Sequence, residues 1–127
     1  ISPAVERLIE CNILLSGVGF ESGGLALAHA IANGLTILPE CKAMHGEAVA
    51  FGLVVQLRLE RAPELDQVLE FCQRVGLPTT LEEMGLGEIS DADLQSVANA
   101  VFRNERNMAN EQAKMTKQKL VQLMCEA

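Results

Sequence analysis

The sequence of 127 residues contains no tryptophan, no tyrosine and only four phenylalanines. It also has few positive charges, because ten lysines and arginines stand against seventeen aspartates and glutamates, for a net charge of -7. Proteins that bind nucleic acids need a basic surface and often stack bases on aromatic side chains, so this composition argues against that class. No apolar run reaches the ~20 residues of a membrane span. We therefore expect neither a nucleic-acid partner nor a membrane partner.

Cysteine pairs with the spacing of a metal site are missing as well. The four cysteines are scattered along the chain without any CxxC, at Cys11, Cys41, Cys72 and Cys125. This pattern favours reduced, mostly buried thiols in a cytoplasmic protein over disulfides or a cysteine-bound metal. The N-terminus lacks a starting methionine and the basic and apolar regions of a signal peptide, so we expect the chain to begin inside a longer one.

Helical periodicity is what the sequence does contain. Nearly half of the residues are apolar (49%), which is enough for the core of one domain over 1–127, and no stretch alternates with the period of a β-strand. Ser2 and Pro3 suit the start of a first helix, which Gly17 and Gly19 would end. Apolar stripes predict further helices over about 23–33, 45–61, 65–75, 81–84, 91–102 and 115–125, with loops over 36–44 and 104–112. The expected fold is all-α, a bundle of six or seven helices.

Both histidines belong to the most apolar part of the chain. The helix over 23–33, capped by Ser22 and ended by Gly34, is apolar nearly all round, which predicts that it is buried. It carries His29, and His45 begins the next helix. Buried imidazoles must satisfy their ring nitrogens, so two of them on adjacent helices suggest a shared metal ion. The competing interpretation is that each is a hydrogen-bonded core residue, and the pattern alone leaves both open.

Three neighbours of the histidines invite a functional interpretation. Glu47 is a candidate general base, but two positions after His45 it points about 200° away on a helix, which favours support of a metal ligand or a structural hydrogen bond. Asn33 follows His29 by one turn and would either orient its ring or cap the helix. Phe51 would either line a substrate pocket or belong to the core, and the core is the more usual place for such a residue.

Three segments resemble the glycerol dehydrogenase family, in the superfamily of iron-type alcohol dehydrogenases and dehydroquinate synthases. They are FESGGLALAHAIANGLT (20–36), HGEAVAFG (45–52) and GLPTTLEEMGL (76–86). The resemblance implies the C-terminal helical domain of such an enzyme. It also implies a catalytic zinc held by an aspartate together with His29 and His45, and no further catalytic residue in this chain. In the full-length enzyme the metal would lower the pKa of the substrate hydroxyl while NAD accepts a hydride, so that glycerol or a related polyol is oxidised, glycerol to dihydroxyacetone.

Three departures from the family pattern bear on activity. The N-terminal nucleotide-binding domain is absent from this chain, the aspartate ligand would belong to a helix upstream of Ile1, and the sequence after Met108 drifts from the family's usual ending. We therefore expect the 127-residue chain to be inactive by itself. Iron and nickel also accept imidazole ligands, so the native metal stays open.

Two alternatives to the dehydrogenase remain. A dehydroquinate-synthase-like lyase would carry a helix start similar to HGEAVA and use zinc with NAD, but the FESGGLA segment favours the dehydrogenase. A non-catalytic helical remnant of the fold is favoured by the missing aspartate and disfavoured by the intact His29 and His45. Because helices that are apolar all round would expose an apolar face without their partner domain, we also expect a homo-oligomer.

Overall fold

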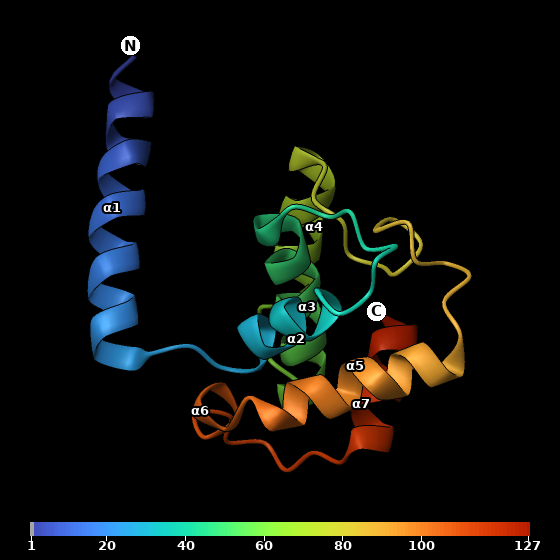
Figure 1. Cartoon of the computed structure of the whole chain (residues 1–127). Coiled ribbons are helices and arrows are strands. Elements are labelled where there is room, and N and C mark those ends of the chain that lie inside the picture. The colour runs from blue at the N-terminus through green and yellow to red at the C-terminus, as the bar shows by residue number, and fades with distance from the viewer. Residues whose placement is uncertain (1) are drawn as a thin grey trace.

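The computed structural model describes residues 2–127, which form seven α-helices and, within that range, no strand. In chain order they are α1 (Pro3–Gly23), α2 (Leu27–Leu35), α3 (His45–Glu60), α4 (Leu65–Val75), α5 (Asp91–Arg103), α6 (Glu105–Met108) and α7 (Lys117–Glu126). Figure 1 shows α2 to α7 gathered in one body, with α1 standing beside it. The predicted all-α class and number of helices are confirmed.

The core of the body is built around α2. α2 packs against α3 and α5, and α3 also contacts α4 and α7. As predicted, α2 is largely buried, through Leu27, Ala28, Ala30, Ile31, Ala32, Gly34 and Leu35. Phe51 of α3 is fully buried against this cluster, so it is a core residue. Since each large apolar side chain contributes about 1.5–3 kcal/mol on burial, the contacts of α2 with α3 and with α5 hold the body together.

The first helix is longer than predicted. Its start is confirmed, because the Ser2 hydroxyl oxygen accepts a hydrogen bond from the Val5 amide at 3.4 Å. It does not end at Gly17 and Gly19, however, but continues to Gly23 and stops at Gly24, where φ is 70°. Ser22 therefore lies inside α1 and caps no second helix. A glycine within a helix costs only about 0.5–1 kcal/mol relative to alanine, so a single one does not terminate it.

α1 is attached to the body only at its C-terminal end. None of its residues is buried, and it packs against no other helix of residues 2–127. The Asn110 side-chain amide donates to the Leu25 carbonyl at 2.8 Å, and the Arg106 guanidinium lies 6.0 Å from the centre of the Phe20 ring. No single helix in residues 2–127 is both long and apolar enough to cross a membrane; α1 and α2 meet that criterion only together, as a pair bent by 103°.

α2 begins and ends later than predicted. It starts at Leu27 instead of residue 23 and includes Gly34, which was expected to end it. Its C-terminal cap is Thr36, whose backbone amide and hydroxyl both donate to the Asn33 carbonyl. Gly34 instead allows close packing on α5, because a β-carbon there would lie 2.9 Å from the Val101 side chain.

Capping side chains set the elements of the C-terminal half. Ser90 caps α5 as predicted, since its hydroxyl oxygen accepts from the Asp93 amide at 3.2 Å. Thr80 caps a turn and not the predicted short helix over 81–84. The predicted loop over 104–112 is wrong in its first part, because the Asn104 side chain caps the one-turn helix α6.

The cysteines are free thiols, as predicted, but their expected burial is wrong. Cys72 is buried and Cys41 is half-buried, whereas Cys11 and Cys125 are exposed. Cys11 belongs to α1, which the rest of the described chain does not cover, and Cys125 lies in the last turn of the chain.

Candidate metal centre

The two histidines lie side by side. His29 belongs to the first turn of α2 and His45 is the first residue of α3. The loop over 36–44 reverses the chain between these helices, so their rings meet with centroids 5.7 Å apart and planes inclined by 54°. The structure thus brings together the two residues that the sequence singled out.

The two rings differ in their environments. His29 is half-buried, whereas His45 is exposed at the helix start, so the expectation of two buried histidines holds only in part. Burial, and secondly the positive charge that His45 can carry, lower the pKa of His29 below its usual 6.5. At neutral pH His29 is therefore a neutral imidazole, which is the form that binds metal ions.

The pair fits part of a metal site. Imidazole nitrogen suits zinc, with a bond of about 2.0–2.1 Å, so two rings at this spacing can reach one ion. Within residues 2–127, no group of three or more histidine, cysteine, aspartate or glutamate side chains could hold a metal ion. The two histidines thus amount to at most two of the three or four protein ligands that a zinc site needs.

The side chains near the pair have structural roles. A carboxylate oxygen of Glu47 accepts from the Met44 backbone amide at 2.7 Å, which satisfies a free donor at the start of α3. The structural interpretation of Glu47 is thereby supported. The Asn33 side chain makes no hydrogen bond to His29 in the described chain, and Asn33 contributes only its carbonyl, to Thr36.

Sequence reasoning missed the residues that hold α2 in place beside α3. The Gln56 side-chain oxygen accepts from the Ala28 backbone amide at 3.0 Å, one residue before His29. Gly52, one turn before Gln56, lies directly against the Ala28 backbone. The only signal in the sequence was the spacing of four residues between Gly52 and Gln56, which places both on one face of a helix.

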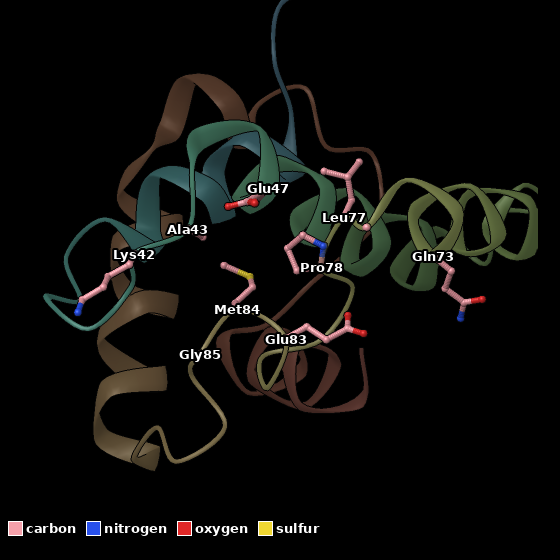
Figure 2. A pocket seen from close by; sticks show the side chains of 10 residues that line it. Lys42, Ala43, Glu47, Gln73, Leu77, Pro78, Glu83, Met84 and Gly85 are labelled. Atoms are coloured by element: carbon pink, nitrogen blue, oxygen red, sulfur yellow. The ribbon is translucent and has the colours of Figure 1, made fainter.

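Neither histidine lines the cavity whose side chains Figure 2 shows. It has a volume of about 550 Å³ and lies between the start of α3, the end of α4 and the segment 77–85. Glu47 and Met84 lie beside it in Figure 2, with Lys42 and Gln73 at opposite margins. Its carboxylates are engaged in local structure, since Glu83 accepts from the Thr79 amide at 2.7 Å as Glu47 does from Met44.

Comparison with known proteins shows clear relatives. No protein-family model matches the chain. It is 49% identical to a glycerol dehydrogenase of Thermotoga maritima over 119 residues, which are 91% of this chain and 33% of that protein. It is 52% identical to a glycerol dehydrogenase of Escherichia coli O6:H1 over 113 residues, which are 87% of this chain and 31% of that protein. The chain therefore spans about a third of the length of these curated relatives and corresponds to a C-terminal portion of them.

The structure points to the same relatives. A probable glycerol dehydrogenase from Sinorhizobium meliloti 1021 superposes with a TM-score of 0.89 at 38% identity, over 98% of this chain and 36% of that one. Because nearly the whole chain is covered, the helical fold agrees with that solved structure. The predicted resemblance is confirmed.

Proposed function

We propose that this chain, a homologue of the glycerol dehydrogenases over about a third of their length, is the metal-binding helical portion of an NAD-dependent polyol dehydrogenase. The proposed reaction oxidises glycerol to dihydroxyacetone. The observation that carries the proposal is the pairing of the His29 and His45 rings, 5.7 Å apart, in a chain about half identical to such enzymes. The exposed free thiols of Cys11 and Cys125 suit a cytoplasmic enzyme.

The proposed contribution of this chain is to present two neutral imidazoles. His29 is kept neutral by its burial, and His45 lies beside it at the start of α3. A metal ion bound there, zinc or else iron or nickel, supplies a Lewis acid that lowers the pKa of an alcohol. Binding of NAD and the third ligand is assigned to the remainder of the full-length enzyme, so the 127-residue chain alone is proposed to be inactive.

The other functions are less well supported. The similarity to glycerol dehydrogenases favours a dehydrogenase over a dehydroquinate-synthase-like lyase. A non-catalytic remnant is favoured by one observation, that only two metal ligands meet within residues 2–127. Activity in a complete enzyme distinguishes these functions.

A chimeric enzyme tests the proposed function. The matching portion of the Thermotoga maritima glycerol dehydrogenase is replaced by this chain, and NAD-dependent oxidation of glycerol is followed. We expect the chimera to be active and to lose activity with His29→Ala or His45→Ala. Asn33→Ala, an exposed change one turn after His29, serves as the control and should leave activity unchanged. A folded chimera that binds zinc through both histidines but oxidises no polyol would overturn the proposal.

We also propose that the chain self-associates through α1. The expected apolar face is not on α2, because α3 and α5 cover it. Instead, eight large apolar side chains spread all round α1 are each 44% to 72% exposed: Val5, Leu8, Ile9, Ile13, Leu14, Leu15, Val18 and Phe20. Contiguous exposed apolar surface of this kind marks sites where proteins associate. A second copy of this chain offers a matching apolar helix.

A further inference from the structure

The N-terminus of α2 lacks a cap of its own. The residue at its N-cap position is Ala26, which has no side chain that could accept a hydrogen bond. The first backbone amides of a helix have no partner within the helix, so each of them needs an acceptor from elsewhere. Ala28 is buried, and a buried backbone amide needs a hydrogen-bond acceptor.

A glutamine from α3 supplies the missing acceptor. The side-chain oxygen of Gln56 accepts from the Ala28 amide at 3.0 Å across the contact between the two helices. The side-chain nitrogen of Gln56 donates to a carboxylate oxygen of Glu60, one turn later on α3, at 2.8 Å. An ionised carboxylate can only accept, so Glu60 requires the glutamine nitrogen and leaves the oxygen to face Ala28.

Gly52 completes the same face of α3, one turn before Gln56. A β-carbon at position 52 would lie 3.0 Å from both the carbonyl carbon and the Cα of Ala28. Glycine thus sets how closely α2 approaches α3, and Gln56 sets the orientation of the first turn of α2. That turn carries His29, while α3 itself carries His45.

We propose that Gln56, oriented by Glu60, is the positioning residue that holds His29 beside His45. Its relevance to a metal site rests on the function proposed above. Gln56 touches neither ring and acts through the backbone amide that precedes His29. Removal of its side-chain oxygen leaves the Ala28 amide without an acceptor, so that the first turn of α2 shifts or frays and the two rings separate.

The test uses the full 127-residue chain without metal, where the only two histidines give unambiguous ring signals in nuclear magnetic resonance. The measurement is the magnetisation transfer between ring protons of His29 and His45, which depends on their separation. Gln56→Leu removes the acceptor at nearly constant volume. The double variant Gln56→Glu with Glu60→Gln exchanges the two groups, so the new glutamine donates to the new carboxylate, whose other oxygen accepts from Ala28.

We expect Gln56→Leu to abolish the transfer between the rings and the exchange variant to restore it. Gln67→Leu, an exposed glutamine change on α4, should leave it intact. Leu123→Ala destabilises the chain at α7 and controls for general loss of stability. In a second measurement, made on the chimeric enzyme described above, the affinity for Co²⁺ should fall by about tenfold or more in Gln56→Leu, the order seen when residues that orient metal ligands are changed, and recover in the exchange variant.

The outcomes separate this proposal from the proposed function. An unchanged contact between the rings in Gln56→Leu overturns the positioning role. Loss of the contact in Leu123→Ala as well, without rescue by the exchange variant, also overturns it, since stability alone would then explain the result. If the chimeric enzyme and every variant of it bind no Co²⁺ while the ring contact responds as expected, the positioning role stands and the metal-binding function fails.

Discussion

The backbone of Ala28 on α2 lies so close to Gly52 on α3 that no β-carbon fits at position 52, since it would lie 3.0 Å from two Ala28 backbone atoms. The contact is one residue from His29. Because backbone atoms cannot yield as the end of a long side chain can, any larger residue must move one helix away from the other.

We therefore predict that Gly52→Ala destabilises the chain by about 1–3 kcal/mol, the usual range for overpacking a core. The free energy of unfolding in urea measures this. Gly46→Ala in the same helix is the matched control, because a β-carbon there meets nothing within 4 Å. That control should leave stability unchanged or raise it slightly, since alanine is the better helix former. Equal effects of the two changes would contradict the close approach of the backbones.

The structural role of Glu47 gives a second prediction. Its carboxylate accepts from the Met44 amide at the start of α3, so Glu47→Ala should lower stability by about 0.5–2 kcal/mol, as for loss of a helix cap. Glu47→Gln keeps an acceptor oxygen and should lose less. In the chimeric enzyme, Glu47→Gln should oxidise glycerol at nearly the unaltered rate. A loss of about 100-fold or more in kcat with the fold intact would instead indicate a general base.

The third prediction concerns stability at acidic pH. Hydrogen bonds hold the pKa of Glu83 below its usual 4.5. They come from the backbone amide and the hydroxyl of Thr79, and to a lesser extent from the backbone amide of Thr80. The folded state therefore binds fewer protons than the unfolded state in this range. The stabilisation that ionised Glu83 contributes is present above pH 4.5 and is lost as the pH falls through the pKa of Glu83 in the folded state.

Melting temperatures of the unaltered chain and of Glu83→Gln, measured from about pH 7 down to about pH 3, test this. The unaltered chain should melt higher at neutral pH, and the difference should shrink towards zero in acid. Glu82→Gln, an exposed neighbour, is the control. A difference that stays constant over the whole pH range would show that the charge of Glu83 has no part in it.

Thiol reactivity provides a fourth prediction. Burial, and secondly the negative charge of Glu83, raise the pKa of the Cys72 thiol, which lowers its reactive thiolate fraction. Cys11 and Cys125 are exposed. Labelling followed by mass spectrometry should show these two reacting first, Cys41 later and Cys72 last. In denaturant all four should react at similar rates, and fast reaction of Cys72 in the folded chain would argue against its position in the core.

Self-association through α1 gives the fifth prediction. Sedimentation should show the unaltered chain as a dimer or larger at high concentration. Lysine substitutions at Leu8, Ile13 and Leu15 together should return it to a monomer of 13.7 kDa, because charges in an apolar interface are unfavourable. Phe71→Lys on α4, another exposed apolar residue, should leave the association unchanged. A monomeric unaltered chain would mean that α1 is not covered by a second copy.

Local signals in the sequence determined most of the helices. α4 and α5 follow the predicted ranges closely, because an apolar stripe between a polar start and a final glycine or polar turn is a property of adjacent residues. Ser2 and Ser90 cap the helices they were expected to cap, since a capping hydroxyl reaches an amide only three residues ahead. The two histidines could likewise be identified as a pair from the apolar helices that carry them.

Only the tertiary structure decided which of these local signals prevailed and what surrounds the histidines. Gly34 could have ended its helix, and its contact with Val101 of α5 explains why a small residue lies inside α2 instead. The exposure of Cys11 depends on the position of α1, which follows from packing and not from its own sequence. Gln56 and Ala28 are 28 positions apart. Their hydrogen bond exists because the loop over 36–44 folds α3 back along α2, and such a long-range contact leaves no periodic pattern in the sequence.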